Sequence, residues 1–439
     1  MDFIALLRGI LGLTVIIGIA LVISNNRRSI RWRTIGAGLS LQIFLAIFIL
    51  KGAAMGEAFA PLGWPKMFLK GVSYFFVLVL QFTTKGAEFI FGSLALPEGT
   101  PGSLGAFFAF QVLPTIIFFG SLMAVLYHLG IMQKVVQGMA FLVSKFLGTS
   151  GAESLSVTAN IFVGQTEAPL VIRPYLEKMT MSELMAVMTG GMATIAGGVM
   201  AAYIQILGDP YAIAHGISLD ASRLLFAEQL LGASVMAAPA ALLLAKIMIP
   251  ETGEPTTKGG AKIEVESTSA NAIDAAANGA SDGLSLALNV GAMLLAFLAL
   301  IAMVNYIIGQ AGGLFGADLT LEMLLGWAVS PIAWLIGVPW ADAVRFGSLL
   351  GTKVILNEFV AYLALAGEIT AGTLDPKTVV MATFALCGFA NLSSIAIQIG
   401  GIGPLAPSRK SDIAKLGVKA VLAGTMANMM TATIAGSLI

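Results

Sequence analysis

Two clusters of polar side chains interrupt long apolar stretches of this sequence. The first lies at residues 165–167, Gln-Thr-Glu, and the second is Asn357 with Glu358. A carboxylate at membrane depth costs roughly 2.5–3.5 kcal/mol on insertion scales, so it persists mainly where it faces a cavity and contacts a ligand, an ion or a partner group. Because Gly164 precedes the first cluster and Pro169 follows it, an unbroken helix is disfavoured. We expect a re-entrant hairpin with the cluster at its tip; the alternative is a kinked helix with one satisfied glutamate.

Two glycine-containing interruptions accompany these clusters. Residues 189–199 and residues 387–394 place glycine and small polar side chains in the middle of apolar stretches, which predicts helices broken midway. Together the tips and breaks would assemble Gln165, Thr166, Glu167, Thr194, Asn357, Glu358, Asn391, Ser393 and Ser394. Amides, hydroxyls and carboxylates without a guanidinium or an imidazole suit a neutral ligand that carries hydroxyl groups and ring N–H or C=O groups. The set argues against phosphates and dicarboxylates as ligands.

The composition limits the class of protein. The chain has 439 residues, of which 57% are hydrophobic and 11% charged, and its mean hydropathy is +0.91. These values are typical of a polytopic membrane protein. The formal net charge is zero, so no basic face is expected for a nucleic acid polymer. The single cysteine, Cys387, excludes an intrachain disulfide and a cysteine-rich metal site.

The apolar stretches predict eight membrane spans. They lie at about residues 3–24, 34–50, 105–127, 181 onward with a break at 189–199, 222–249, 270–308, 376 onward with a break at 387–394, and 416–436. Residues 52–103 are too charged and interrupted for a core ~30 Å thick, so interfacial and external helices are expected there. Capping-box patterns at residues 150–153 and 180–183 open the first hairpin and the fourth span.

The order of these elements repeats. A hairpin with a glutamate, a broken span and a whole span occur twice, and the positions of the charges make the second copy enter from the opposite side. The arginines at residues 27–33 mark a cytoplasmic turn, which places both termini outside. Inverted repeats with discontinuous helices are typical of secondary transporters. The fold class is therefore an all-α polytopic membrane protein with about eight transmembrane helices, two re-entrant hairpins in inverted repeats, broken helices and interfacial helices.

Two long motifs resemble the concentrative nucleoside transporter family, as a bacterial member. They are Gly-Gln-Thr-Glu-Ala-Pro at residues 164–169 and Gly-x-Lys-x-x-x-Asn-Glu-Phe-x-Ala-Tyr at residues 351–362. The similarity extends from about residue 100 to the C-terminus. The resemblance implies a homotrimer in the bacterial inner membrane and sodium-coupled import of nucleosides by an elevator mechanism. It also implies a scaffold domain, residues 1–128 and 251–316, and a transport domain, residues 129–250 for the first repeat and 317–439 for the second.

The resemblance also assigns the site, residue by residue. It implies that the nucleobase contacts three polar residues and two apolar walls, which are Gln165, Thr166, Glu167, Val199 and Phe389. The ribose would contact Glu358, Asn391 and Ser394. Sodium would be bound by the side chains of Asn160 and Thr194 and by the carbonyls of Val163 and Ile195. Gly164-Gln165 resembles members that accept uridine-like and purine nucleosides alike.

Several alternatives stay open at this point. A proton could replace sodium as the coupling ion, and a channel would need polar residues along continuous helices instead of broken ones. Residues 148–151, Gly-Thr-Ser-Gly, match a short pattern of intramembrane serine proteases, with Ser150 as the nucleophile, although no histidine lies mid-span. Lys353 either partly neutralises Glu358 or extends its ammonium to the membrane interface.

Overall fold

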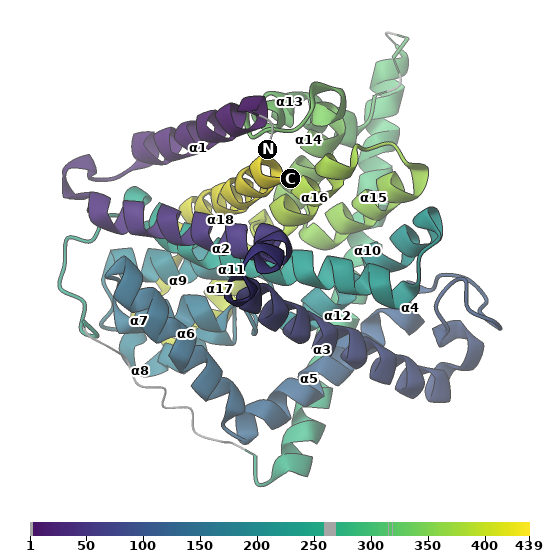
Figure 1. Ribbon diagram of the computed structural model, residues 1–439, viewed down its shortest axis with the longest axis horizontal. Coiled ribbons are helices and arrows are strands. Elements are labelled where there is room, and N and C mark those ends of the chain that lie inside the picture. Colours follow the sequence, from purple (N-terminus) through teal and green to yellow (C-terminus); the bar gives the residue numbers. More distant parts are fainter. Residues whose placement is uncertain (1–2, 259–268, 315, 318) are drawn as a thin grey trace.

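The structure is a computed structural model that describes residues 3–258, 269–314, 316–317 and 319–439. Throughout these residues the regular elements are helices, as the apolar stretches predicted. Figure 1 shows the helices packed into one bundle, with α12 (Ala272–Gly313) reaching beyond the rest of the molecule at both ends. The sequence also predicts a polar connection at residues 251–282, part of it an interfacial helix. Residues 259–268 of this connection lie outside the described part of the chain.

Within the described residues, eight helical segments are long and apolar enough to cross a membrane. They are Ile4–Ile23, Trp32–Ala58, Ala60–Ala95, Phe108–His128, Met181–His215, Leu219–Met248, Ala272–Gly313 and Pro407–Leu438. A ninth is counted if α13 (Leu321–Leu335) and α14 (Trp340–Ile355), bent by 119° to each other, form one broken span. The prediction of eight spans agrees with the eight segments in number, but the two sets differ in one member each. The structure adds Ala60–Ala95, and the predicted seventh span is divided into two short helices.

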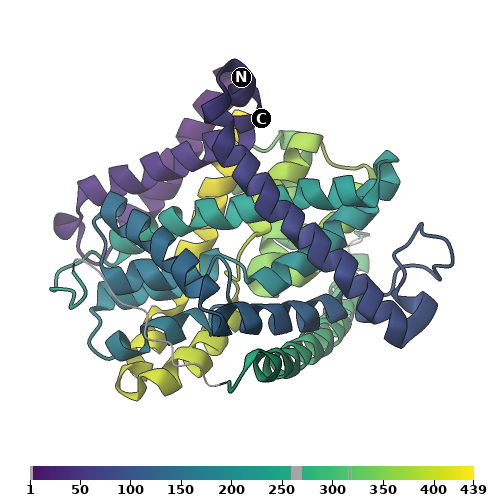
Figure 2. The ribbon, with the colours of Figure 1, turned by 60° about the horizontal axis from the view of Figure 1, so that its bottom comes forward.

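The expectation for residues 52–103 is wrong in one respect. Instead of interrupted short helices, the segment contains α3 (Ala60–Phe91), a continuous helix of 32 residues that follows α2 (Trp32–Ala58) directly. Figure 2 shows α3 running obliquely across the bundle. Its charge at Lys66 does not interrupt the helix, because it pairs with Glu228 on α11 (Leu219–Met248). Charged residues on one face of a long helix can thus be satisfied by a neighbouring helix, which the linear sequence does not reveal.

The first repeat forms a hairpin and a broken helix as predicted. One hairpin arm is α7 (Gly151–Ala159), and the returning arm is η3 (Ala168–Ile172) with α8 (Arg173–Leu176). Both predicted capping boxes are present, at Ser150 and at Thr180. The broken helix consists of α9 (Met181–Ala193) and α10 (Gly197–His215), separated by three residues. The unbroken α11 completes the repeat.

The second repeat has the same order of elements. Its hairpin arms are α14 and α15 (Glu358–Ala371), which meet at Leu356 and Asn357. Its broken helix consists of α16 (Pro376–Leu386) and α17 (Leu392–Ile402), and α18 (Lys410–Leu438) is the whole span. The remaining elements are α1 (Phe3–Ile23), α4 (Phe108–Gln111), α5 (Leu113–His128), α6 (Ile131–Leu147), η1 (Arg27–Ser29), η2 (Gly92–Ala95), η4 (Gly403–Leu405) and η5 (Pro407–Arg409).

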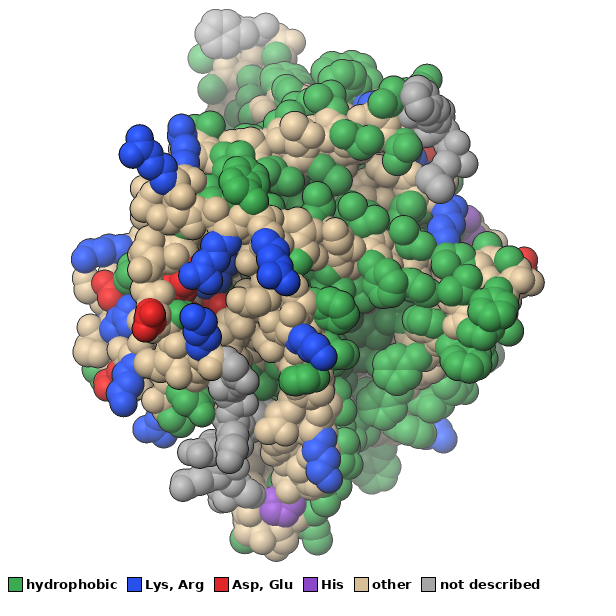
Figure 3. Space-filling view, turned by 60° about the vertical axis from the view of Figure 1, so that its left-hand side comes forward, with side chains coloured by type: hydrophobic (Ala, Val, Ile, Leu, Met, Phe, Trp, Pro, Cys, Tyr) green, Lys and Arg blue, Asp and Glu red, His purple; other side chains and the backbone are tan. Residues whose placement is uncertain are grey.

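Burial separates the helices into two groups. The helices α9, α10, α11 and α18 are almost entirely buried and form the core, whereas α1, α2, α3, α5 and α12 are buried on one side only and expose many apolar side chains. Apolar side chains that face outward are expected where lipid or another subunit covers them. Figure 3 shows the charged side chains gathered on one part of the surface beside a broad apolar area, on the side where the α1–α2 connection lies.

Candidate functional site

A pocket of about 160 Å³ lies where the two hairpin tips and the two helix breaks converge on α12. All eight residues to which the resemblance assigned substrate contacts line this one pocket: Gln165, Thr166, Glu167, Val199, Glu358, Phe389, Asn391 and Ser394. Asn357 and Ser393 line it as well. Thr194 does not, because it lies at the first break beside the hairpin turn. The four elements are far apart in sequence, and the repeats bring them together.

The tip of the first hairpin is a short non-helical turn between Asn160 and Ala168. A Cβ at residue 164 would lie 2.2 Å from Glu167 Oε2, so any larger residue there would have to displace the Glu167 carboxylate. Gln165 is buried, whereas Glu167 is exposed and folds back over Gly164. The two polar residues therefore differ in environment: Gln165 is fixed inside the protein, and the Glu167 carboxylate remains open to the pocket.

The Glu358 carboxylate is held on both oxygens. Glu358 is the first residue of α15, and Asn357 caps that helix by accepting a hydrogen bond from the Val360 N–H at 3.0 Å. The Tyr203 hydroxyl donates to Glu358 Oε1 at 2.9 Å, and Asn391 Nδ2 donates to Oε2 at 2.9 Å. The carboxylate is therefore held in one orientation at the N-terminus of α15 by these hydrogen bonds. Its remaining lone pairs can accept from ligand hydroxyl groups.

A second hydrogen-bond chain joins the two repeats through Gln165. Its Nε2 donates to Ser394 Oγ at 3.1 Å, and its Oε1 accepts from Gln398 Nε2 at 3.1 Å. Gln398 also donates to the carbonyl of Met188 at 2.9 Å. Ser394 in turn belongs to the first turn of α17, where its N–H donates to Asn391 Oδ1 at 2.9 Å. Gln165, which is assigned to the nucleobase, is therefore directly hydrogen-bonded to Ser394, which is assigned to the ribose.

Some parts of this site were not found from the sequence. The apolar wall from α12 consists of Leu286, Val290, Met293 and Leu294, and Phe359 and Ile397 add to it. The four α12 residues are spaced as one helical stripe, but an apolar stripe is common in a membrane helix and carries no specific signal. Tyr203 and Gln398 were also missed, because their polar atoms act only through partners that are distant in sequence.

The residues assigned to sodium lie together at the first helix break. The Gly197 N–H donates to the Phe162 carbonyl at 2.9 Å and so ties the start of α10 to the hairpin turn that contains Val163. Asn160 Nδ2 donates to the Ser156 carbonyl at 3.2 Å, which leaves Oδ1 as the ligand atom that this side chain can offer. The Ser156 and Thr158 hydroxyl oxygens are buried and have no hydrogen-bond partner among the described residues. Buried oxygens of this kind suit a hard cation.

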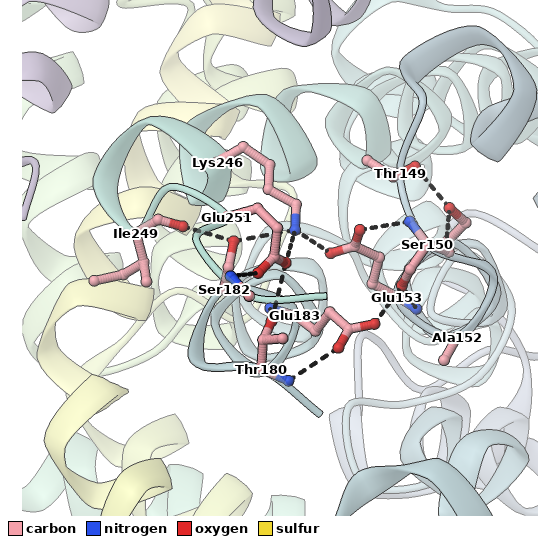
Figure 4. Close-up of polar contacts among 12 residues, drawn as sticks. Thr149, Ser150, Ala152, Glu153, Thr180, Ser182, Glu183, Lys246, Ile249 and Glu251 are labelled. Atoms are coloured by element: carbon pink, nitrogen blue, oxygen red, sulfur yellow. Dashed lines mark hydrogen bonds and ion pairs between the residues drawn. The ribbon is translucent and has the colours of Figure 1, made fainter. Parts of the chain in front are cut away.

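Ser150, the proposed protease nucleophile, serves as a helix cap. Its Oγ accepts from the Glu153 N–H and donates to Glu183 Oε1 at 2.6 Å. Figure 4 shows it beside the ion pairs of Lys246, which lies 2.7 Å from Glu153 Oε2 and 3.2 Å from Glu251 Oε2. The hydroxyl is occupied by structural hydrogen bonds, which explains the pattern at residues 148–151 without a catalytic role.

Of the two alternatives for Lys353, extension of its ammonium to the membrane interface is wrong. The side chain is completely buried, and Nζ donates to the Ala385 carbonyl at 2.9 Å and to Asn428 Oδ1 at 2.7 Å. The linear sequence places Lys353 near the end of a helix, where such extension is common. Packing of α16 against α14, together with the hydrogen bond to Asn428 of α18, buries it instead.

Comparisons with known proteins cover almost the whole chain. Residues 11–94 match the family described as Na+ dependent nucleoside transporter N-terminus, residues 109–210 match Nucleoside recognition, and residues 229–436 match Na+ dependent nucleoside transporter C-terminus. The chain is 48% identical over 433 residues to an uncharacterized transporter, YutK of Bacillus subtilis, covering 98% of this chain and 99% of that protein. It is 43% identical over 432 residues to the nucleoside permease NupC of Helicobacter pylori, covering 97% and 96% respectively.

Solved structures of CNTnw are also similar to this chain over almost its whole length. CNTnw in an inward-facing substrate-bound state has 44% sequence identity to this chain and a TM-score of 0.85, with 99% of this chain and 98% of that chain covered. A variant of CNTnw in an outward-facing state has 44% identity and a TM-score of 0.87, with 100% and 98% covered. These relatives are transporters, not enzymes. The chain is a member of the concentrative nucleoside transporter family.

Proposed function

We propose that this protein is a sodium-coupled nucleoside symporter that imports nucleosides across the bacterial cytoplasmic membrane by an elevator-type mechanism. The observation that carries the proposal is the pocket, in which both hairpin tips and both helix breaks supply polar side chains opposite the apolar stripe of α12. Discontinuous helices that meet in this way bind substrate and coupling ion between the repeats of secondary transporters. The absence of a guanidinium or imidazole from the described pocket lining favours a neutral ligand.

The two ends of a nucleoside fit two sides of this pocket. The ribose has vicinal hydroxyl groups, and the Glu358 carboxylate is held in place by Tyr203 and Asn391 to accept from them. The nucleobase has a flat apolar face and a polar edge, which suit Phe389 and the Gln165 amide. Discrimination then follows from hydrogen bonding, because a buried polar group left unpaired costs about 1–3 kcal/mol.

Sodium is supported by the oxygen chemistry of the first break. Asn160 and Thr194 offer side-chain oxygens, and the connected turns offer the carbonyls of Val163 and Ile195. The Ser156 hydroxyl, buried with no hydrogen-bond partner in the described part of the chain, adds a further oxygen within one helical turn of Asn160. The break also ends α9, so a cation there is favoured by the carbonyl end of that helix.

Movement of the transport domain against the scaffold domain would open the pocket to each side of the membrane in turn. We assign residues 1–128 and 251–316 to the scaffold and residues 129–250 and 317–439 to the transport domain. The assignment is supported by the pocket, whose polar lining comes from the second pair of segments and whose opposite wall comes from α12. A smooth apolar wall offers no hydrogen bonds that must break when the transport domain slides past it.

The external surface is consistent with a trimer in a bilayer. Apolar side chains of α12 such as Leu295, Tyr306 and Ile307 are 75%, 69% and 59% exposed in the single chain. A homotrimer that packs scaffold domains together would cover part of this surface, and lipid would cover the rest. The arginine-rich α1–α2 connection would face the cytoplasm, with both termini outside.

Uptake of labelled uridine into proteoliposomes tests the coupling ion directly. An inward sodium gradient at equal pH should drive accumulation above the equilibrium level, and a proton gradient in choline medium should not. Competition by a panel of pyrimidine and purine nucleosides then defines the substrate range. Accumulation that follows the proton gradient and ignores sodium would replace the sodium assignment with proton coupling while retaining the nucleoside site.

A further inference from the structure

Lys353 is a buried lysine that interacts electrostatically with Glu358 but forms no ion pair with a described carboxylate. Its side chain has no solvent exposure, and among the described residues no carboxylate lies within ion-pair distance of its ammonium. The ammonium instead donates to the carbonyl of Ala385 at 2.9 Å and to Asn428 Oδ1 at 2.7 Å. A buried charge outside an ion pair is costly, and the hydrogen bonds to these two acceptors offset part of that cost.

The Ala385 carbonyl belongs to the last turn of α16, where the second broken helix stops. The last carbonyls of a helix have no intrahelical partner, and together they attract a cation. Lys353 comes from the first arm of the second hairpin, five residues before Glu358. It therefore joins a hairpin arm to the carbonyl end of a broken helix through a positive charge.

The first repeat offers a comparable arrangement, in which the proposed sodium would take the place of the ammonium. There the carbonyl end of α9 and the turn of the first hairpin supply the oxygens proposed for sodium. Asn428 of α18 connects the two places, because its Oδ1 accepts from Lys353 while its Nδ2 donates to the Ala193 carbonyl at 2.7 Å. Ala193 is the last residue of α9. One asparagine side chain thus contacts the carbonyl end of one broken helix and the cation at the other.

Gly388 permits this close approach. Its φ of 138° is unfavourable for other residues, and a Cβ there would lie 2.7 Å from both the Ala193 carbonyl oxygen and Asn428 Oδ1. The break between α16 and α17 can therefore press against the end of α9 only with glycine at this position. The two helix breaks and Asn428 form one compact polar centre beneath the pocket.

We propose that Lys353 is a tethered cation that fills the second repeat's counterpart of the sodium site. This proposal rests on the proposed sodium coupling. Its ammonium keeps the second hairpin and break permanently in a cation-bound arrangement, whereas the first hairpin and break are completed only when sodium binds. Replacing Lys353 with a small neutral residue should leave the Ala385 and Asn428 oxygens around a vacancy. A small external cation can then occupy that vacancy.

The test compares Lys353→Ala, which opens space, with Lys353→Met, which removes the charge but fills the space. Thermal unfolding of the purified variants is followed without nucleoside in choline chloride, in sodium chloride and in methylammonium chloride. Both variants should unfold at temperatures lower than the parent by roughly 5 °C or more, because two buried acceptors lose their donor. Methylammonium or sodium should raise the midpoint of Lys353→Ala with saturation, and should shift Lys353→Met no more than the parent.

An equal response of the two variants to every salt would overturn the proposal, as would parent-like stability of Lys353→Ala in choline. If neither variant is recovered folded from ordinary medium, expression with methylammonium supplied decides the matter: recovery of Lys353→Ala alone supports a cation site, and recovery of neither contradicts it. Because these measurements use no nucleoside and no gradient, they are independent of the uptake assay. If uptake by the parent protein does not depend on sodium, the proposed function is contradicted. The unfolding measurements on the Lys353 variants would still test the cation site on their own.

Discussion

The Tyr203 hydroxyl donates to Glu358 Oε1 over 2.9 Å and so joins the second half of the first broken helix to the tip of the second hairpin. Tyr203 is completely buried, and its ring centroid lies 4.5 Å from that of Tyr362 and 4.7 Å from that of Phe359. Aromatic packing fixes the ring, and the ring fixes the hydroxyl. The carboxylate proposed to bind ribose is therefore positioned by groups of the protein itself.

Replacing Glu358 with glutamine should remove ribose recognition. The amide keeps the shape of the side chain, but it presents a donor to either Tyr203 or Asn391 and loses the charge. Loss of a hydrogen bond to a charged group, about 1.5–3 kcal/mol, corresponds to roughly 10- to 150-fold weaker uridine binding. Binding of uridine, 2′-deoxyuridine and 3′-deoxyuridine to the variant should become similar. Tyr203→Phe is the matched control, with a smaller loss in the same direction; a variant that still discriminates the three ligands as the parent does would contradict the assignment.

Gln165→Met should change base selectivity. The Gln165 amide is held by Ser394 and Gln398, so its orientation is fixed and an unpaired base edge costs about 1–3 kcal/mol, or roughly 5- to 150-fold in affinity. Pyrimidine nucleosides should lose more than purine nucleosides in a competition assay. Since the substitution also frees Ser394, Ser394→Ala measures that separate contribution. A uniform loss for all bases would show that Gln165 supports the site without reading the base.

The hairpins and breaks were predictable because each has a local cause. Glutamate and asparagine inside apolar stretches need a cavity, and glycine-rich interruptions need a break, so residues 164–169 and 387–394 identified their elements directly. The capping boxes at Ser150 and Thr180 depend on side chains three residues apart, and both are present. Local chemistry of this kind can be recognised in one sequence without knowledge of the packing.

Contacts between distant segments were not predictable in the same way. The sequence left extension of Lys353 to the interface open as one of two alternatives, because its partner Asn428 is 75 residues away. The charges that suggested an interrupted segment before residue 103 are compatible with the continuous α3, since Glu228 of another helix pairs with Lys66. The α12 wall of the pocket consists of apolar residues that would be equally suitable against lipid. In each case the residue that determines the environment of the side chain lies far away in the sequence.

Lys246→Met should destabilise the protein through its buried partner. Glu153 is 1% exposed and its carboxylate lies 2.7 Å from the Lys246 ammonium, so removal of the lysine leaves an uncompensated buried charge. Breaking a buried ion pair from one side costs about 3–5 kcal/mol. The unfolding temperature should fall clearly, and the double variant Lys246→Met/Glu153→Gln should recover much of the loss.

The matched control is Lys258→Met, because Lys258 lines the same cavity as Lys246 and Glu153 but has an exposed side chain. Its effect should be below about 0.5 kcal/mol, because a surface substitution removes little. Equal destabilisation by Lys246→Met and Lys258→Met would contradict the interpretation that the buried ion pair holds the base of the first hairpin.

Sodium coupling through the first helix break predicts a specific kinetic change. One sodium entering down about 100 mV contributes about 2.3 kcal/mol and a tenfold gradient about 1.4 kcal/mol, which together sustain about 500-fold accumulation of a neutral nucleoside. Asn160→Ser shortens one proposed ligand, and Thr194→Ala removes the hydroxyl that lies 2.8 Å from the Gly190 carbonyl. Both variants should raise the sodium concentration for half-maximal uridine uptake at least several-fold, while uridine affinity at saturating sodium changes little. Thr383→Ala, which removes a buried hydroxyl that donates to the Val379 carbonyl on α16, is the control and should keep the sodium dependence of the parent. If all three variants keep that dependence, the ion is bound elsewhere.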